Sequence, residues 1–571
     1  MRCRYLSLLS RISATRSFYF AVGGAYDITS TLQINDAVAS AAAGLSVFAT
    51  PAPLAMLHSA DGSGSVAASS PVSSGSTPPV APCVGTYVPP PPSETTAAAA
   101  APLWRTADPR FFWNRGRVHE LVEGAGASFV TPFINGFVGA ATVHDVDLLA
   151  LARKASDGVA ANEGAASDMT LLLISRRGVT RQGMRFTVRG ADAEGNVANF
   201  AETEQILTMP GGRAASSYTQ ARGSIPLLWE QLPTLKYTPR ASLSPNTAGS
   251  ALAFDRHISS MLRHYAGSVL AVCLIDKKGD QLTLGTAFAN AAQKLLHADA
   301  SGVTAAESAA LVGGATTSSD TESSSSSLTG APSSPVAAAA DGLSFTWFDF
   351  HAECRKMKWG NLSKLMDAVE SRLTAQGYYA RGSNGRVIRI QQGVVRTNCM
   401  DNLDRTNVVQ SLFARRAALE AVPGAWAATR AAGTSVLTSS FPGFEAAFNG
   451  LWADNADALS VLYSGTGALK TDFTRTGRRT MSGALSDGVN SVVRFVLNNL
   501  SDGRTQDAWD LFTGRYIPHR EAVVHVKGVD GVASAARSQK RSPVVDHIEE
   551  LTPVSVMGRP VPCHVMSVCR I

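Results

Sequence analysis

The sequence predicts an α/β fold (α+β overall), because runs typical of buried strands and spacings typical of helices both occur along it. Residues 169–174 and 267–275 are short apolar runs of the kind found in buried strands. Within residues 362–373 the apolar side chains recur at steps of one, three and four, which places them on one face of an amphipathic helix. A strand, a tight loop and a helix are also expected in succession around residue 399.

That succession follows from local patterns. Apolar and polar residues alternate from residue 387 and are followed by an apolar run up to residue 395. This pattern is typical of a strand that ends just before Arg396. Residues 406–421 contain good helix formers and neither Pro nor Gly, so we expect them to form a helix. The residues between these two segments then form a tight loop at the start of the helix.

The chain of 571 residues is too long for one compact core, so we expect two or more lobes. Its charged share of 17% is low because Ala, Ser, Gly and Pro tracts are long. Residues 59–102 and 298–341 are dominated by these residue types and are interpreted as disordered insertions, and the mixed tail 517–571 is expected to be poorly ordered. No apolar stretch is long enough to cross a membrane.

Charge and cysteine usage narrow the function classes. The net charge of +6 favours anionic partners such as phosphates or lipid surfaces. Nucleic-acid binding has only this charge in its favour, so no nucleic-acid partner is expected. The seven cysteines are an odd number at wide spacing, which suits a reducing compartment. They form no CxxC pair and no zinc-like cluster with His, so we expect neither a metal nor another cofactor.

Cys399 and Arg405 have Cys-x5-Arg spacing within the expected loop. A loop that closes onto a helix N-terminus turns its backbone N–H groups inward and adds the positive end of the helix dipole. Such a field lowers the pKa of a thiol and yields a thiolate nucleophile. The same N–H groups can cradle phosphate oxygens. The loop residues expected to contact the phosphate are Met400, Asn402 and Leu403.

The expected reaction is in-line attack by Cys399 on a phosphate, a phosphocysteine intermediate, and hydrolysis by water. Arg405 can curl back over the loop so that its planar fork pairs two phosphate oxygens. The Thr406 hydroxyl stabilises the departing thiolate, and Asp401 or Asp404 protonates the leaving alcohol. Asp401 is preferred, because Asp404 adjoins Arg405 and can instead orient it.

Three features have open interpretations. The spacing at Cys399 also arises by chance around a structural cysteine, and the strand–loop–helix context gives the catalytic interpretation equal weight. The five arginines within residues 176–189 form either a solvated strand and hairpin or a basic surface that meets anionic lipid. Lys470, beside the Gly-rich turn 465–467, either faces the phosphates of the substrate or lies in a solvated loop.

Residues 396–407 read Arg-Thr-Asn-Cys-Met-Asp-Asn-Leu-Asp-Arg-Thr-Asn. They resemble the catalytic motif of the Sac-domain phosphoinositide phosphatases, Arg-x-Asn-Cys-x-Asp-Cys-Leu-Asp-Arg-Thr-Asn. Four further blocks are similar to that family: residues 175–205, 222–229, 348–354 and 452–473. They follow the family's order, with the insertions between them, and such ordered agreement is more specific than one motif.

The resemblance implies that a monophosphate is hydrolysed from the inositol headgroup of a membrane lipid, most typically phosphatidylinositol 4-phosphate, without a metal. It implies the Sac phosphatase fold, a β-rich N-terminal subdomain packed on an α/β catalytic subdomain with the phosphate loop between strand and helix. It places the protein peripherally at the cytoplasmic face of endomembranes (ER or Golgi), with a membrane-recruiting protein as an additional partner.

Two rival functions stay open beside this one. A catalytically weak phosphoinositide-binding or scaffold protein would keep the same fold without efficient turnover. A protein phosphatase would share the Cys-x5-Arg loop, but it does not explain the other four blocks of resemblance. The first rival is therefore the stronger alternative.

The sequence departs from the family pattern in three ways. The family's second loop cysteine is Asn402 here, which leaves the nucleophile in place. Residues 17–33 resemble a block from well inside the N-terminal subdomain, so the chain is expected to begin partway through it. The two C-terminal transmembrane helices of the membrane-anchored members have no counterpart in the tail.

The expected segments are 1–58, a partial N-terminal Sac subdomain; 59–102, a low-complexity insertion; 103–225, the remainder of the N-terminal subdomain; 226–297, the first part of the catalytic subdomain; 298–341, a Ser/Ala-rich insertion; 342–516, the catalytic subdomain with the phosphate loop; and 517–571, the tail.

Overall fold

A computed structural model describes most residues outside the expected insertions but little of the insertions and the tail. The described residues are 2–21, 26–42, 102–118, 121–122, 126–154, 168–232, 234, 239–298, 342–434, 437–469, 475, 481–515 and 568–570. The predictions for the two low-complexity insertions therefore lie almost wholly outside the described residues. So does the prediction for Lys470.

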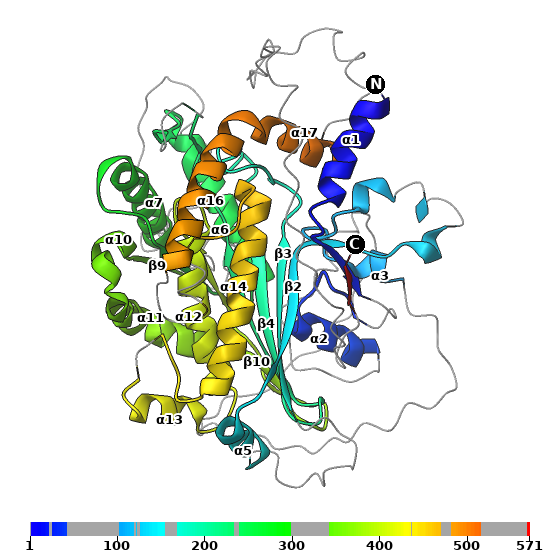
Figure 1. Cartoon of the computed structure of the whole chain (residues 1–571), viewed down its shortest axis with the longest axis vertical. Helices are drawn as coiled ribbons and strands as arrows, with labels where there is room; N and C mark the ends of the chain where they lie inside the picture. Colours follow the sequence, from blue (N-terminus) through cyan, green and yellow to red (C-terminus); the bar gives the residue numbers. More distant parts are fainter. Residues whose placement is uncertain are drawn as a thin grey trace, which may run out of the picture.

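One 11-stranded mixed sheet forms the centre of the molecule (Figure 1). Its main path, in spatial order, is β13 (Val568–Arg570), β1 (Phe18–Ala21), β2 (Ile134–Val143), β3 (Met169–Arg177), β4 (Ala201–Thr208), β5 (Ala215–Arg222), β12 (Val394–Asn398), β8 (Val269–Cys273) and β9 (Leu343–Trp347). The hairpin β10 (Tyr379–Arg381) and β11 (Val387–Arg389) joins β5 through β10. A separate ribbon contains β6 (Trp229–Glu230) and β7 (Ser242–Leu243). Strands on both sides of the expected boundary near residue 225 thus share one sheet.

The sheet changes from antiparallel to parallel at β5. Strands β1 to β5 pair with their neighbours antiparallel, whereas β5, β12, β8 and β9 run parallel. Their carboxyl ends therefore lie at one edge, where Asn398 pairs with Cys273 and Cys273 pairs with Trp347. Ligands of α/β sheets bind at this kind of edge, and Cys399 follows β12 directly.

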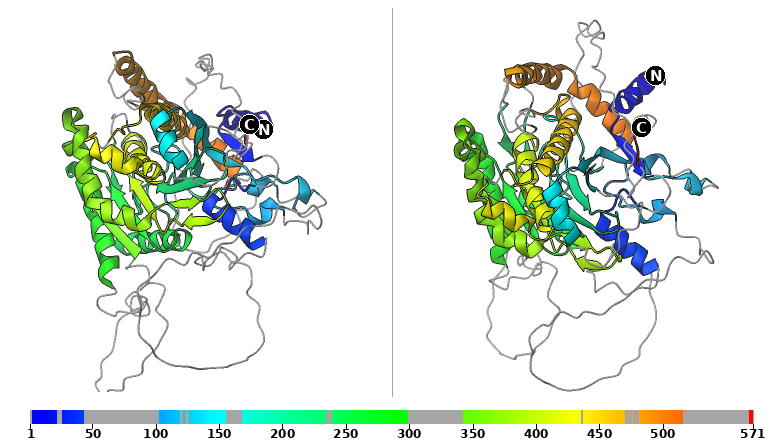
Figure 2. Two further views of the ribbon diagram at one scale, coloured as in Figure 1. Left: turned by 90° about the horizontal axis from the view of Figure 1, so that it is seen from below. Right: turned by 60° about the horizontal axis from the view of Figure 1, so that its bottom comes forward.

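Helices cover both faces of the sheet (Figures 1 and 2). They are α1 (Arg2–Ser13), α2 (Leu32–Ala42), α3 (Leu103–Thr106), α5 (Val146–Lys154), α6 (Thr247–His264), α7 (Gly279–Ala298), α10 (Phe350–Glu353), α11 (Leu362–Gln376), α12 (Asp404–Glu420), α13 (Ala425–Ala431), α14 (Pro442–Ser464), α16 (Met481–Leu500) and α17 (Asp502–Thr513). Short 3₁₀ turns span Arg115–Arg117, Ala127–Phe129, Arg355–Met357 and Trp359–Asn361. Among the helices that the structure describes, none is long and apolar enough to cross a membrane.

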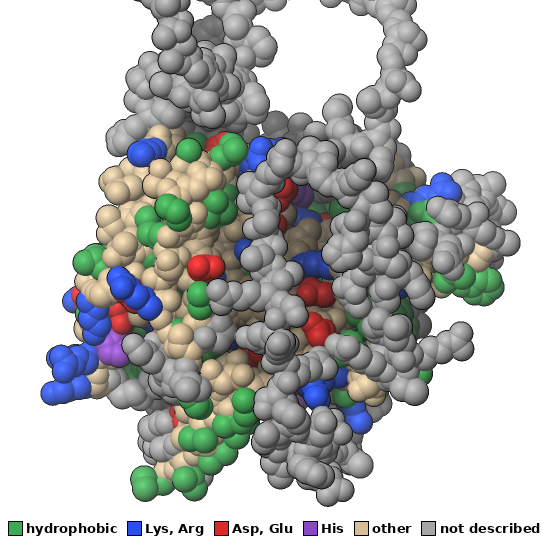
Figure 3. All heavy atoms as spheres, turned by 90° about the horizontal axis from the view of Figure 1, so that it is seen from above, with side chains coloured by type: hydrophobic (Ala, Val, Ile, Leu, Met, Phe, Trp, Pro, Cys, Tyr) green, Lys and Arg blue, Asp and Glu red, His purple; other side chains and the backbone are tan. Residues whose placement is uncertain are grey.

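The two faces of the sheet hold separate cores because neighbouring strand residues point in opposite directions. Val395 packs in the core beneath α11, α12 and α14, whereas Val394 packs in the core beneath α6 and α7. A third core joins β1 and the start of α2 to β3 and β4. The helix α16 projects from this body and carries hydrophobic side chains on its outer surface (Figures 2 and 3).

Several local predictions are confirmed. The expected strands at 169–174 and 267–275 are β3 and β8, and the expected amphipathic helix is α11. Its buried apolar residues are Leu362, Leu365, Met366, Val369 and Leu373. The helix expected at 406–421 begins two residues earlier, at Asp404.

The single strand expected at 387–395 is wrong in one respect, since the segment is divided into β11 and β12. The side-chain amide of Gln391 donates to the carbonyls of Thr219 and Gly393 and fixes the crossing between the two strands. Three residues of the tail form β13 beside β1.

Both interpretations of the arginine stretch are wrong for Arg176 and Arg177, which are fully buried. These residues end the central strand β3, so their side chains point into the protein. Arg176 bonds to Glu202 at 3.1 Å and to Glu204 at 2.6 Å. Arg177 bonds to Asn135 and lies over the ring of Trp113.

Removing one partner of the buried ion pairs should destabilise the protein strongly. We expect Arg176→Met to lower the free energy of unfolding by about 3–5 kcal/mol, because it leaves Glu202 and Glu204 buried without a cation. Arg240→Met is the control, since Arg240 pairs with Asp280 at the surface, and it should change stability by less than about 1 kcal/mol. Denaturant titration measures both values, and equal losses would contradict the assignment.

Candidate active site

Cys399 is a free, buried cysteine in the first position after β12. Residues 399–403, called the Cys399 loop below, connect β12 to the first turn of α12. The backbone of the loop turns at Asn402, which has a φ of 55°. Asn tolerates this left-handed conformation better than most residues, so its presence there suits the turn.

The residues before the loop are held from two sides. The backbone N–H of Leu274 donates to the carbonyl of Asn398 at 2.8 Å, and the side-chain amide of Asn398 donates to the sulfur of Cys273 at 3.4 Å. Arg396 donates to the side-chain oxygen of Asn398 at 2.6 Å. Burial lowers the pKa of Arg396 to about 10, still above neutral. Cys399 therefore follows a strand end with fixed neighbours.

Two arginines hold the Cys399 loop through Asp401. Arg185 and Arg189 each donate to one oxygen of the Asp401 carboxylate, both at 2.6 Å. Arg189 also donates to the carbonyl of Met400 at 3.0 Å. Burial alone would raise the pKa of Asp401, but the two arginines outweigh it, and the net pKa lies well below its usual range. Asp401 is therefore held as a carboxylate.

Asp404 has the opposite environment. It is the first residue of α12, and its carboxyl accepts a hydrogen bond from the backbone N–H of Leu469 at 2.9 Å. Burial raises its pKa, and the charge of Arg494 opposes only part of that effect. The pKa values of Asp401 and Asp404 are thus shifted in opposite directions. Such opposite shifts give paired carboxyls different roles in proton transfer.

Arg405 extends toward the neighbouring strand β8. Its guanidinium donates to the carbonyl of Leu274 at 3.2 Å and to Asp276 at 2.9 Å. Burial lowers the pKa of Arg405, but the charges of Cys399 and Asp276 raise it, and the net shift is upward. Arg405 is therefore a permanent cation, bound to Asp276 in this structure.

Thr406 is fully buried, and its hydroxyl has no hydrogen-bond partner in the part of the chain that the structure describes. The side-chain oxygen of Asn402 is also buried without a partner there. Leu403 is buried as well, in a small core with Leu459 and Tyr463. The Thr406 hydroxyl is thus free to donate to a thiolate or a ligand, whereas the Asn402 oxygen can only accept a hydrogen bond.

The structure adds site residues that we did not predict from the sequence. Burial lowers the pKa of Arg222 to about 10, and the charges of Tyr463 and Cys399 partly offset this effect. The guanidinium of Arg222 donates to Asn407 at 3.3 Å. In the sequence, Arg222 belongs to a block that resembles the family, and Arg185 and Arg189 belong to an arginine-rich stretch. No local spacing relates any of them to Cys399.

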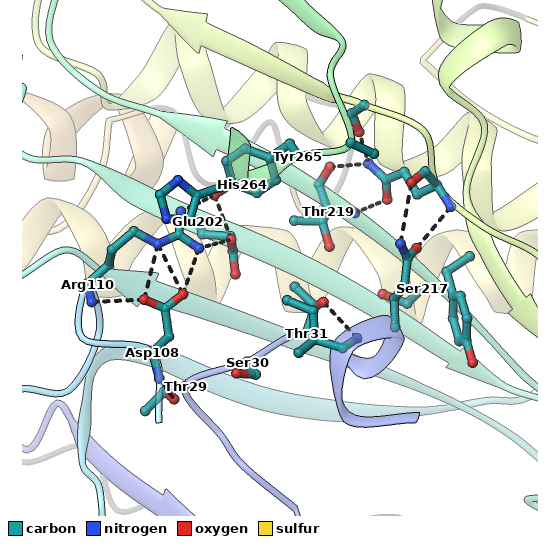
Figure 4. Close-up of a pocket in the computed structure, with 16 residues that line it drawn as sticks. Thr29, Ser30, Thr31, Asp108, Arg110, Glu202, Ser217, Thr219, His264 and Tyr265 are labelled. Carbon is teal, nitrogen blue, oxygen red and sulfur yellow. Dashed lines mark hydrogen bonds and ion pairs between the residues drawn. The ribbon is translucent and has the colours of Figure 1, made fainter. Parts of the chain in front are cut away.

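No metal centre is found in the described ranges, where no three His, Cys, Asp or Glu side chains are grouped to hold an ion. A cavity of about 60 Å³ lies elsewhere, between the start of α2 and the end of α6 (Figure 4). Arg110 binds Asp108 at 2.7 Å in its wall, and Tyr265 donates to Glu202 at 2.6 Å. The charged and polar groups in the wall are thus hydrogen-bonded to one another, and they connect the segments on the two sides of the cavity.

Comparison with known proteins relates the chain to one family. Residues 1–355 match the family model described as the SacI homology domain. The chain is 36% identical over 417 residues to "Phosphatidylinositol-3-phosphatase SAC1" of Drosophila melanogaster, covering 73% of this chain and 58% of the relative. It is 35% identical over 446 residues to the protein of the same name from Saccharomyces cerevisiae, covering 74% and 59%.

A plant relative gives a similar result. The chain is 35% identical over 419 residues to "Phosphoinositide phosphatase SAC6" of Arabidopsis thaliana, covering 73% of this chain and 58% of the relative. The chain thus spans a little under three fifths of the length of these curated relatives.

The helix α17 supports the segment that carries Arg185. Gln506 accepts a hydrogen bond from the backbone N–H of Met184 at 3.0 Å and donates to the carbonyl of Gln182 at 3.3 Å. Asp502, the first residue of α17, is buried, and one of its oxygens has no partner among the described residues. Burial raises the pKa of Asp502 to about 7, against the charge of Arg185.

This carboxyl should make stability depend on pH. Between about pH 4 and 7 the folded state keeps the proton that the unfolded state loses, so stability falls as pH rises through this range. We expect Asp502→Asn to raise the free energy of unfolding at pH 8 by on the order of 2 kcal/mol, with a smaller gain at pH 5.

Asp507→Asn, at an exposed position of the same helix, is the control. Denaturant titrations at several pH values measure the difference between each variant and the unmodified protein. A gain from Asp502→Asn that does not change with pH would contradict the assignment to this carboxyl.

Proposed function

Because the chain belongs to the SacI homology domain family, we propose that it is a phosphoinositide phosphatase whose nucleophile is Cys399. The observation that carries the proposal is the setting of this cysteine. It is free and buried, it lies between a strand end and a helix start, and Arg189, Arg222 and Arg405 are its electrostatic neighbours. A thiolate and a phosphate both require such a positive environment.

In the proposed reaction the Cys399 thiolate attacks the phosphorus atom in line with the inositol oxygen. The sulfur–phosphorus bond forms while the bond from phosphorus to the inositol oxygen breaks. The backbone N–H groups of Met400, Asn402 and Leu403 bind the phosphate oxygens. Water then attacks the phosphocysteine, which releases inorganic phosphate and restores the thiolate. The free hydroxyl of Thr406 supports a role in stabilising that thiolate.

Arg405 binds the phosphate in this proposal. Its partner in the described structure is Asp276, with which an incoming phosphate competes. A dianionic phosphate offers two oxygens to the planar guanidinium, whereas Asp276 receives one hydrogen bond from it. Lys470 is a further proposed contact of the headgroup, since it follows Leu469, whose backbone binds Asp404.

We propose Asp404 as the general acid in place of Asp401, which the sequence favoured. A general acid must hold a proton before the leaving oxygen departs. The raised pKa of Asp404 supports that role, whereas Arg185 and Arg189 keep Asp401 ionised. Asp401 then positions the Cys399 loop through its two arginines.

The proposed substrate is a lipid with one phosphate on its inositol ring, and we retain phosphatidylinositol 4-phosphate as the first choice. Two relatives carry the name "Phosphatidylinositol-3-phosphatase", which makes the 3-phosphate the rival. A lipid substrate supports action at the cytoplasmic face of endomembranes, by peripheral contact or with a recruiting partner. The alternative function is a phosphoinositide-binding protein with weak catalysis, which the Arg405–Asp276 ion pair favours.

The first test is phosphate release from the short-chain 3-phosphate and 4-phosphate lipids. We expect turnover by the unmodified chain and a loss of at least about a thousandfold in Cys399→Ser, because the hydroxyl is a far weaker nucleophile. Cys354→Ser, at the end of α10, is the control and should retain activity. A folded protein that binds but does not hydrolyse these lipids would favour the alternative function.

The roles of Asp404 and Asp401 can be distinguished with two substrates whose leaving groups differ in their need for a proton. We expect Asp404→Asn to lower kcat for the lipid by about a hundredfold or more, but to spare an aryl phosphate whose leaving group needs no proton. Asp401→Asn should slow both substrates alike, because it releases Arg185 and Arg189 from the loop. The reverse pattern would return the acid role to Asp401.

A further inference from the structure

The helix α16 exposes a row of apolar side chains to solvent. Seven of them are between 41% and 90% exposed. They are Met481, Leu485, Val489, Val492, Val493, Val496 and Leu500. Apolar residues scattered singly over a surface need no explanation, but a row along one helix indicates a contact surface. In Figure 3 these hydrophobic side chains form a continuous stripe at the lower edge of the molecule.

The row occupies one side of the helix. At about 100° per residue, the seven side chains fall within an arc of about 120°. Arg494 and Asn498, which are buried, lie on the opposite side of α16. The charged residues of the helix are Asp487 and Arg494, and neither falls within the arc. The helix is thus amphipathic, with an uncharged outer surface.

The inner side of α16 contacts the segment 466–469, which reaches Asp404. Arg494 donates to the hydroxyl of Thr466 at 3.0 Å and to the carbonyl of Gly467 at 2.8 Å. The same segment continues to Leu469, whose backbone N–H binds Asp404. The charge of Arg494 acts on Asp404 as well. These contacts therefore hold α16, and with it the row of apolar side chains, in a fixed position relative to the Cys399 loop.

We propose that α16 lies in the surface of the lipid bilayer that holds the substrate, with its apolar row among the acyl chains. This inference rests on the proposed function, because a phosphoinositide presents its headgroup only at such a surface. A helix with one apolar side and low overall hydrophobicity lies in the membrane interface and does not span it. Among the described helices none can span a membrane, α16 included.

The chemistry of the row favours lipid over a protein partner. It contains only aliphatic side chains and one Met, whereas protein interfaces are anchored mostly by Trp, Tyr and Arg. Aliphatic side chains are sufficient to enter the acyl region. Since the arc has no Lys or Arg, binding depends on apolar burial and should persist in high salt, unlike that of a polybasic segment.

The test replaces three exposed apolar residues of the row in the full chain. In Leu485→Gln/Val489→Gln/Val492→Gln the changed side chains are exposed, so the fold should be retained. We expect at least a roughly tenfold loss of binding in sedimentation with phosphatidylcholine vesicles that contain phosphatidylinositol 4-phosphate. Ile388→Gln on β11 is the matched control, because Ile388 is 72% exposed and Leu485 is 73% exposed. It should bind as the unmodified protein does.

Comparing a vesicle-bound substrate with a water-soluble one distinguishes a defect in membrane binding from a defect in catalysis. The triple variant should lose turnover of the vesicle lipid by the same factor as binding, while turnover of a water-soluble short-chain phosphoinositide stays unchanged. Vesicle binding that depends on the row, with no turnover of either substrate by the unmodified chain, would refute the proposed function alone.

Unchanged vesicle binding by the triple variant would overturn the inference. So would binding by the unmodified protein that high salt abolishes. A dimer that the triple variant dissociates in analytical ultracentrifugation, without a change in vesicle binding, would instead assign the row to a second copy of this chain.

Discussion

The structure of the candidate site depends on Asp401, which forms one hydrogen-bonded ion pair with Arg185 and another with Arg189. Residues 399–403 belong to no helix or strand, so their position has to be fixed from outside. Both arginines come from the connection between β3 and β4, and Gln506 of α17 holds that connection in turn. The connection after β3 and the helix α17, which are far apart in the sequence, therefore act together to position the loop that carries Cys399.

The same physical constraint explains why so many arginines are buried around this sheet. Burying a cation is costly unless hydrogen bonds satisfy it, and removing one partner leaves the other uncompensated. Arg176 has two glutamates, whereas the hydrogen bonds of Arg222 and Arg396 to described residues go to uncharged groups, and burial lowers the pKa of each of these two to about 10. Both remain charged near neutral pH. The charge of Arg222 also interacts with Cys399, which follows the carboxyl end of β12.

The elements that depend on local pattern could be predicted from the sequence. The apolar spacing of α11 and the strand and helix on either side of Cys399 are properties of contiguous residues. The partners of Asp401 could not be predicted, because Arg185 and Arg189 lie more than two hundred positions away and meet it only through the folded sheet. For the same reason the burial of Arg176 and Arg177 could not be predicted, since the central position of β3 is a tertiary property. The preference for Asp401 over Asp404 rested on sequence adjacency, which carries no information on burial.

The central claim is that Cys399 forms a covalent bond to the phosphate of a phosphoinositide. Its most direct test is to mix the protein with substrate, quench in denaturant within one turnover, and locate the phosphoryl group by mass spectrometry of the digested chain. The account predicts phosphate on the peptide that contains Cys399, absent in Cys399→Ser and longer-lived when attack by water is slowed. Substrate turnover without a phosphoryl group on Cys399, or with the group on another residue, would contradict it.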